Sequence, residues 1–325
     1  MSVPPMRRAG IVLLLALLVA SASAWGGTRR AKKDILRGDA LRTGEIVSRK
    51  GNAQAGAHPS EILSIRRGRV ERQGLFKPAL GEKRTLLGVL GHIRPGTHVV
   101  REVATFDLAY QLHATFVPPT VGREIEGRHG SVQMMVKAQR AADAYRPGRQ
   151  LVRRDAERMR VFDYLIGNSD RTVRNLMVRA RHRGDIPVAI DNGNAFPRGA
   201  IPHFQWPTDW IVSHKGPLRA DTLQWLREID PIMVADVLAG AGIEREATVH
   251  VLRRLERLKR DPSFLEVPKG GRRAVAIQMY VRATLAGRSR TQGLRRSQRA
   301  AIDDIVARAY AAVDPEPVMA LQPAH

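Results

Sequence analysis

The stretch Val161–Pro197, VFDYLIGNSDRTVRNLMVRARHRGDIPVAIDNGNAFP, decides the fold of this 325-residue chain. Its apolar residues first recur at helical spacing, up to a glycine that can take the left-handed conformation that ends a helix. A polar loop over 168–175 follows, and then two short apolar strands, over 176–178 and 186–190, that are joined by turn residues. The stretch therefore predicts a helix, a loop and a hairpin, with Asp191 directly after the second strand.

Three polar side chains at the ends of these elements form a pattern that suits phosphoryl transfer. Such transfer needs a carboxylate that orients the acceptor hydroxyl, and ligands for the metal ions that hold the phosphates. We expect Asp170 to face the acceptor, and Asn175 and Asp191 to supply hard oxygen ligands for Mg²⁺ or Mn²⁺. A surface hairpin with helix-capping Asp and Asn residues is the alternative interpretation of the same pattern.

The same stretch resembles the active-site region of atypical kinases. That group includes the phosphatidylinositol 3- and 4-kinase-like proteins of bacteria, the HipA-type kinases and the secreted Golgi kinases that phosphorylate casein-like proteins. The residues that carry the resemblance are Phe162–Arg171, Asn175-Leu176 and Ala189–Gly193. The family pattern is Asp-Arg-His, then Asn, then a strand and a metal-binding Asp, and Thr172 stands where the family usually has His.

A second set of residues resembles the lysine strand and the glutamate helix of that family. Leu75-Phe76-Lys77-Pro78 matches the strand, and Arg101-Glu102-Val103-Ala104 matches the start of the helix, which the apolar spacing extends to His113. The resemblance implies that Lys77 holds the nucleotide phosphates and that Glu102 pairs with it. We therefore predict a Lys77–Glu102 ion pair, although a lone lysine in such a position is ordinarily a surface residue.

The nucleotide, ATP or a relative of it, would contact two further regions. The small, flexible run over 51–57 begins with Gly51 and Asn52, and such a loop lets backbone N–H groups approach phosphates closely. A plain hairpin turn is the alternative for this run. Gln133 and Met135 lie where a strand ends at an expected hinge between lobes, which could supply an apolar wall and backbone hydrogen bonds for the base. Core packing is the commoner role for methionine.

These patterns predict an α+β, two-lobe, protein-kinase-like fold with a small β-rich lobe and a larger helical lobe. The expected divisions are a signal peptide over 1–24, a basic linker over 25–45, an N-lobe over 46–137, a C-lobe over 138–265 and a helical extension over 266–325. A first helix around residues 33–41 is the alternative within the linker, and the folded part is expected to start near Ile46. Amphipathic spacing predicts helices over 218–229, 232–241 and 245–259 in the C-lobe, and over 274–285 and 296–313 in the extension.

Composition indicates a globular protein with a strongly basic surface. Apolar residues make up 43% of the chain, and the formal net charge is +23. Such a charge attracts an anionic membrane or another polyanion, although an evenly spread, solvated basic surface explains it equally well. The chain has no cysteine, which excludes a disulfide-linked partner and cysteine zinc ligands.

The first residues have the pattern of a secretory signal peptide. Arg7 and Arg8 precede a short apolar run over 11–20, and Ala22-Ser23-Ala24 suits cleavage before Trp25. The run is shorter than the roughly 20 residues that span a bilayer, so we expect export to the periplasm or beyond, with an uncleaved membrane anchor as the alternative.

Together these observations predict an exported kinase-like phosphotransferase. It would move a phosphoryl group from ATP or a related nucleotide to a hydroxyl on a protein, lipid or sugar. The alternative is a pseudokinase-like module of the cell envelope that binds a nucleotide or polyanion without catalysis.

Overall fold

The computed structural model describes residues 38–52, 59–80, 82, 92–141, 151–168, 170–171, 174–182, 184–198 and 217–265. The expected signal peptide, the helical extension, Thr172 and most of the flexible run over 51–57 lie outside these residues. Among the described helices, none combines the length and the apolar character that a membrane span requires.

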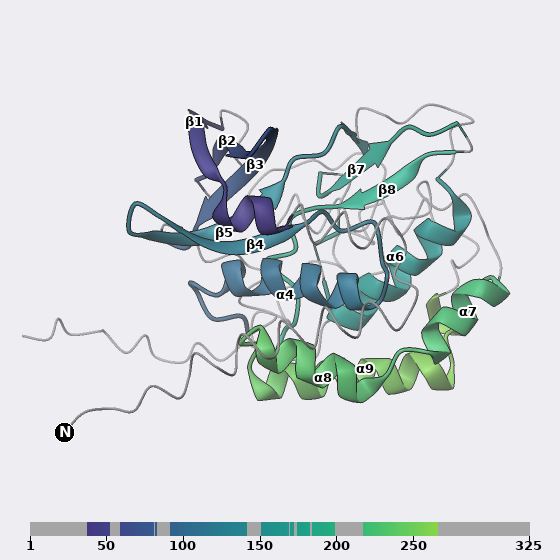
Figure 1. Ribbon diagram of the computed structural model, residues 1–325. Helices are drawn as coiled ribbons and strands as arrows, with labels where there is room; N and C mark the ends of the chain where they lie inside the picture. Colours follow the sequence, from purple (N-terminus) through teal and green to yellow (C-terminus); the bar gives the residue numbers. More distant parts are fainter. Residues whose placement is uncertain are drawn as a thin grey trace, which may run out of the picture.

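A five-stranded antiparallel sheet forms the first lobe (Figure 1). Its strands run in the spatial order β1-β2-β3-β5-β4. They are β1 (Glu45–Gly51), β2 (Glu61–Arg67), β3 (Val70–Pro78), β4 (Thr120–Ile125) and β5 (Arg128–Met134). Helix α4 (His98–Gln111) is inserted between β3 and β4 in the chain and packs against β4 and β5.

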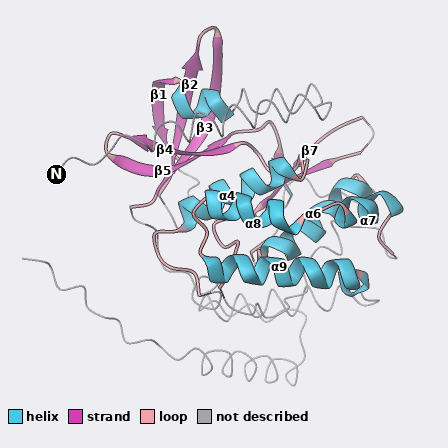
Figure 2. Ribbon diagram, turned by 60° about the horizontal axis from the view of Figure 1, so that its bottom comes forward, coloured by secondary structure: helices cyan, strands magenta, loops and turns pink. Residues whose placement is uncertain are grey.

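The second lobe is mainly helical. A small sheet of three strands, β6 (Gln139–Arg140), β7 (Leu176–Arg179) and β8 (Ile186–Ala189), adjoins helices α6 (Arg153–Ile166), α7 (Ala220–Arg227), α8 (Pro231–Gly240) and α9 (Arg245–Arg260) and the 3₁₀ turn η2 (Ser263–Leu265). Figure 2 shows the helices from α4 to α9 gathered on one side of the five-stranded sheet. The order of α6, β7 and β8 confirms the helix, loop and hairpin that the sequence predicted.

The two faces of the five-stranded sheet differ because side chains alternate along each strand. Phe76, Val132 and Val121 lie opposite one another on β3, β5 and β4, and they form one side's apolar core. Lys77 and Ser131, each one position away, are paired across β3 and β5 and face the other side. A regular antiparallel register therefore turns the lysine away from the lobe's own core and toward the second lobe.

The first apolar core includes a segment that was expected to be linker. Residues 38–43 are helical, and Leu41 is fully buried in the core of the sheet. Arg123 on β4 holds this segment by donating to the carbonyls of Leu41 and Gly44. The folded part therefore begins before residue 46, where the sequence placed its start, and residues 38–41 overlap the helix over 33–41 that was the alternative to a linker.

Helix α4 belongs to the larger core rather than to the sheet alone. Its buried Ala104, Leu108 and Leu112 share one apolar cluster with residues of α6, α8 and α9. Burial of that face fixes the helix against the second lobe. This placement matters because α4 carries Glu102.

Asp107 on α4 gives the fold a predictable dependence on pH. Burial raises the pKa of its carboxyl from 3.8 to about 6, although Arg42 partly opposes this shift. A carboxyl whose pKa is higher in the folded chain weakens the fold as the pH rises through the interval between the two values.

We therefore expect Asp107→Asn to stabilise the protein at pH 8 by roughly 1–3 kcal/mol and to have little effect near pH 4. Thermal unfolding followed at both pH values checks this. An equal shift in melting temperature at the two pH values would mean that the charge on Asp107 is not the cause.

Candidate active site

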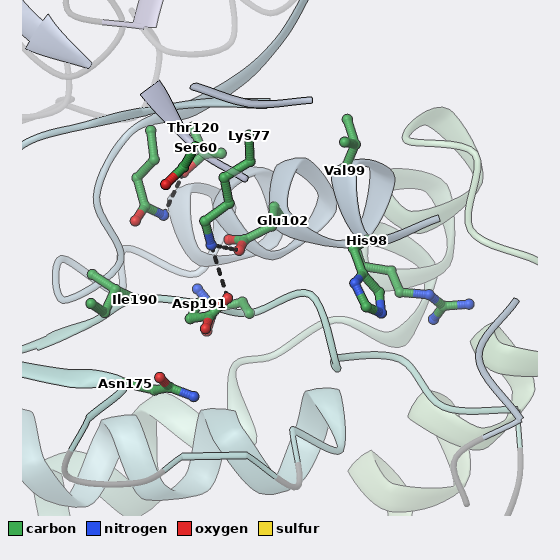
Figure 3. A network of polar contacts seen from close by, with 12 residues as sticks. Ser60, Lys77, His98, Val99, Glu102, Thr120, Asn175, Ile190 and Asp191 are labelled. Atoms are coloured by element: carbon green, nitrogen blue, oxygen red, sulfur yellow. Dashed lines mark hydrogen bonds and ion pairs between the residues drawn. The ribbon is translucent and has the colours of Figure 1, made fainter. Parts of the chain in front are cut away.

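Lys77 is held between two carboxylates from different parts of the chain (Figure 3). Its Nζ lies 2.7 Å from Glu102 Oε1 on α4 and 2.8 Å from Asp191 Oδ1, just after β8. The predicted Lys77–Glu102 ion pair is confirmed. The contact with Asp191 joins the sheet of the first lobe to the hairpin of the second.

Lys77, Glu102 and Asp191 are charged side chains that differ in how far they are buried. The side chains of Lys77, Glu102 and Asp191 are 21%, 3% and 49% exposed. Burial alone would lower the pKa of the Lys77 amine, but the carboxylates of Asp191 and Glu102 outweigh it and raise this pKa well above its ordinary value. Lys77 is therefore a permanent cation. Glu102 Oε2 is buried without a hydrogen-bond partner among the described residues.

Asp191 stands on a tight turn that presses against the start of α4. Its φ is 57°, a left-handed conformation that is uncommon outside glycine and that recurs at functional sites. Two residues later, a Cβ on Gly193 would lie only 3.1 Å from the Cβ of His98 at the first turn of α4. Any larger residue at this position would have to displace His98, so glycine lets the Asp-Asn-Gly turn approach the helix closely.

Asn175 connects Asp170 to the strand that leads to Asp191. Its amide nitrogen donates to the carbonyl and to Oδ2 of Asp170, both at 2.9 Å. Its carbonyl accepts a hydrogen bond from Ile190 N at 3.2 Å. Asn194 also donates to Asp170 Oδ2, at 3.4 Å. The structure therefore brings the five predicted residues Lys77, Glu102, Asp170, Asn175 and Asp191 into one connected region.

Arg171 organises the loops beneath that region. Its side chain is fully buried and pairs with the buried Asp163 of α6 at 3.0 Å. It also donates to the carbonyls of Asn175 and Ile190 and to the side chain of Asn192. One guanidinium thus ties the loop that carries Asp170 to the turn that carries Asp191.

The residues predicted to contact the nucleotide base lie at the edge of the same sheet face. Ile62, Leu75, Gln133 and Thr120 are opposite one another across β2, β3, β5 and β4. Gln133 is buried and donates to Thr120 Oγ1 at 3.0 Å, whereas Met135 is 42% exposed just beyond β5. The sequence named Gln133 and Met135, and their contact with a base stays a prediction; it did not name the apolar pair Ile62 and Leu75, whose position on this face depends on the strand register.

Gly51 and Asn52 occupy the end of β1, where the flexible run begins. The side chain of Asn52 donates to Ser60 Oγ at 2.9 Å, and its N–H donates to the Ser60 carbonyl. This pairing closes the base of the hairpin between β1 and β2. Residues 53–58 lie outside the described part of the chain, so the approach of this loop to the phosphates stays a prediction.

Oxygen atoms suited to a divalent cation are present, although they do not form a complete cage. The described residues contain no group of three or more His, Asp and Glu side chains placed to hold a metal ion. The predicted ligands Asn175 and Asp191 are neighbours through the bond from Ile190 N to the Asn175 carbonyl. The amide oxygen of Asn175 accepts no hydrogen bond from the described residues, and the Asp191 carboxylate is half exposed.

Comparison with known proteins decides the family. The model of the family described as phosphatidylinositol 3- and 4-kinase matches residues 79–255, more than half of the chain. The chain belongs to the phosphatidylinositol 3- and 4-kinase family. The predicted resemblance is thereby confirmed, and the two-lobe α+β structure is the kinase-like fold that the sequence indicated.

Solved structures similar to this family member are distant in sequence. One is the Helicobacter pylori proinflammatory kinase CtkA, at 13% identity with a TM-score of 0.42, over 68% of this chain and 94% of that one. Another is HipA of Shewanella oneidensis MR-1, in a toxin–antitoxin complex with HipB and operator DNA, at 12% identity with a TM-score of 0.28, over 87% of this chain and 70% of that one. No curated protein matches the sequence.

The family match contains four of the five residues that meet in the site of this kinase-family protein. Inside the matched residues 79–255 lie Glu102, Asp170, Asn175 and Asp191. Lys77 lies two positions before the start of that range. Sequence reasoning assigned roles to these five but gave none to Arg171, although it stands next to Asp170 in the motif. The position of Arg171 depends on four acceptor residues in three segments of the chain, which no local spacing reveals.

We predict that Asp163→Ala destabilises this kinase-family protein by about 3–5 kcal/mol, because it leaves the Arg171 guanidinium buried without its counter-charge. Chemical denaturation measures the loss. Glu256→Ala is the control, since Glu256 pairs with Arg260 on the surface of α9 with both side chains mainly exposed. That control changes stability by no more than about 0.5 kcal/mol. Equal losses would show that the Asp163–Arg171 pair contributes no more than a surface pair.

Proposed function

We propose that this protein transfers a phosphoryl group from ATP or a related nucleotide to a hydroxyl acceptor. The observation that carries the proposal is the convergence at Lys77. A cation on β3 meets Glu102 and Asp191, and Asn175 links the strand before Asp191 to Asp170. Membership of a kinase family gives the general reaction class, and the residues present supply each charge that the reaction needs.

Each residue of the site has a distinct part in this proposal. Lys77 would hold the α- and β-phosphates, because its amine is fully protonated and Glu102 directs it. Asp170 would orient the acceptor hydroxyl, a task for which its carboxylate is positioned by Asn175 and Asn194. The lysine and the acid belong to different lobes, so the nucleotide would lie where the lobes meet.

Mg²⁺ or Mn²⁺ would be held by Asn175 and Asp191. The fit rests on the amide oxygen of Asn175, which accepts no hydrogen bond from the described residues, and on the half-exposed carboxylate of Asp191, both hard oxygen donors. Mg²⁺ is commonly bound by one or two carboxylates together with substrate phosphates and waters. When bound, such an ion neutralises the charge that develops on the phosphates.

The base of the nucleotide would lie on the sheet beside Lys77. Ile62 and Leu75 supply an apolar wall on the face that carries the lysine, and Gln133 borders it. The backbone after β5, near Met135, would offer hydrogen bonds to the base. Gly51 and Asn52 would begin a loop whose backbone approaches the phosphates.

The acceptor is a hydroxyl of a protein, lipid or sugar. The +23 net charge favours acceptors on an anionic membrane or another polyanion, because long-range attraction raises their local concentration. Such attraction is weakened by salt.

We further propose that the protein is exported, on the evidence of the N-terminal pattern alone. The expected mature N-terminus is Trp25, directly after Ala22-Ser23-Ala24. N-terminal sequencing of protein recovered from the periplasm or medium of a bacterial host tests this. Protein that is recovered only from the cytosol, or that still begins at Met1, would contradict cleavage and export.

Two substitutions separate the roles of the carboxylates. Asp191→Asn keeps a residue type that tolerates the left-handed turn and removes the charge, so we expect metal-dependent nucleotide binding and transfer to be lost together. Asp170→Asn should retain nucleotide binding and lower turnover by on the order of 10²–10⁴-fold. Calorimetric binding with Mg²⁺ or Mn²⁺ and transfer of labelled phosphate, including autophosphorylation, are the measurements.

Asp236→Asn on the surface of α8 is the control, and it should match the unmodified protein in both measurements. Unchanged nucleotide binding in Asp191→Asn would mean that the proposed site is wrong.

A second function, nucleotide binding without catalysis, is favoured by Thr172 in place of the family His. It would be established by nucleotide binding that requires Asp191, with no transfer to any acceptor and no effect of Asp170→Asn.

A further inference from the structure

A fully buried arginine stands next to Glu102 in α4. Arginine is almost never fully buried unless it is paired, yet the Arg101 side chain is 0% exposed. Its Nε donates to Thr97 Oγ1 at 3.1 Å, its Nη1 to the carbonyls of Ala195 (2.9 Å) and Phe196, and its Nη2 to Glu244 Oε1 and Oε2 at 3.1 and 2.9 Å.

These partners come from three separate segments. Thr97 is the N-cap residue of α4 itself, and Glu244 is the N-cap residue of α9. Ala195 and Phe196 follow Asp191 within five positions. The guanidinium therefore joins the helix that carries Glu102 to the segment that carries Asp191, and it fastens both to the helical core.

We propose that Arg101 is a positioning residue that sets the separation of Glu102 and Asp191, so that both carboxylates reach the Lys77 amine. The proposal rests on the proposed function for one point, which is that Lys77 binds the nucleotide phosphates. It adds a residue that touches neither the nucleotide nor Lys77 and acts through the two carboxylates beside it.

The segment after Asp191 is held from its other side as well. Phe196 takes a left-handed φ of 56°, and its N–H donates to the Ile166 carbonyl at the end of α6 at 2.6 Å. Gly193 lies against His98 at the first turn of α4. The apolar face of α4 packs against the second lobe, and the hydrogen bonds of the Arg101 guanidinium, here called the Arg101 fork, add a polar contact that joins α4 directly to the segment after Asp191.

The geometry of the contact requires arginine. A guanidinium presents five N–H donors in a rigid plane, and Arg101 directs them to two carbonyls, a hydroxyl and a carboxylate. A lysine has three donors on one flexible atom and cannot serve partners on opposite sides. Arg101→Lys therefore keeps the buried charge opposite Glu244 while it releases part of the fork.

The stability of the folded chain reports on this geometry without any need for activity. If Arg101 sets the separation of Glu102 and Asp191, the contacts of Lys77 with both carboxylates depend on the Arg101 fork. Removal of the amine by Lys77→Met should then cost less stability when the fork is already released. A double-mutant cycle on the free energy of unfolding, measured by chemical denaturation of the full chain, tests this coupling.

We expect the loss of stability caused by Lys77→Met to be at least halved in the Arg101→Lys background. The control is Arg123→Lys, which alters another arginine that binds two main-chain carbonyls, on the opposite face of the sheet. In that background the loss caused by Lys77→Met should be unchanged. If Arg101→Lys does not fold, as judged by circular dichroism, Glu244→Gln retains the arginine and weakens one arm, and it should give a smaller reduction of the same sign.

Turnover supplies the second readout through a double-mutant cycle. Arg101→Lys should lower transfer about tenfold in the unmodified protein and have no further effect when Glu102→Gln is already present, because both changes then act on the same contact. Additive losses in the stability cycle or in the turnover cycle would overturn the positioning role. If no transfer occurs but the stability cycle shows the expected coupling, the proposed function fails and the positioning role stands.

Discussion

The site depends on one amine that neutralises two carboxylates from distant parts of the chain. Lys77 and Asp191 are 114 positions apart, and their ion pair directly connects the five-stranded sheet to the segment that follows the hairpin. Two acids placed this close would repel each other without the cation, and the cation would be costly to bury without the acids. Each charge is thus a condition for the position of the other two.

Buried arginines carry much of the arrangement around that amine. Arg171 ties the Asp170 loop to the Asp191 turn, and Arg101 ties the Asp191 segment to α4. Both satisfy main-chain carbonyls and a carboxylate together, which a planar guanidinium with five donors can do. In a chain with such an excess of basic residues, some buried arginines therefore hold segments of the interior together, while others contribute positive charge at the surface.

The five-stranded sheet divides its two faces between stability and chemistry. Phe76 and Val132 pack into the apolar core on one face, while Lys77 and Ser131, their chain neighbours, meet on the other. A shift of one residue in the β3–β5 register would bury the lysine in the apolar core and expose phenylalanine to the site. The register is consequently a functional constraint as well as a structural one.

The sequence by itself determined the family and the α+β class, because one continuous run from Phe162 to Gly193 resembles the kinase motif and its spacing predicts a helix, a loop and a hairpin. The same resemblance, rather than any spacing, singled out Lys77 and Glu102. Only the tertiary structure decided the rest. The burial of Leu41, the facing of Leu75, and the partners of Arg101 and Arg171 arise from contacts between remote segments. The Arg101–Glu244 pair joins residues 143 positions apart, and a bond of that span leaves no periodic trace in the chain.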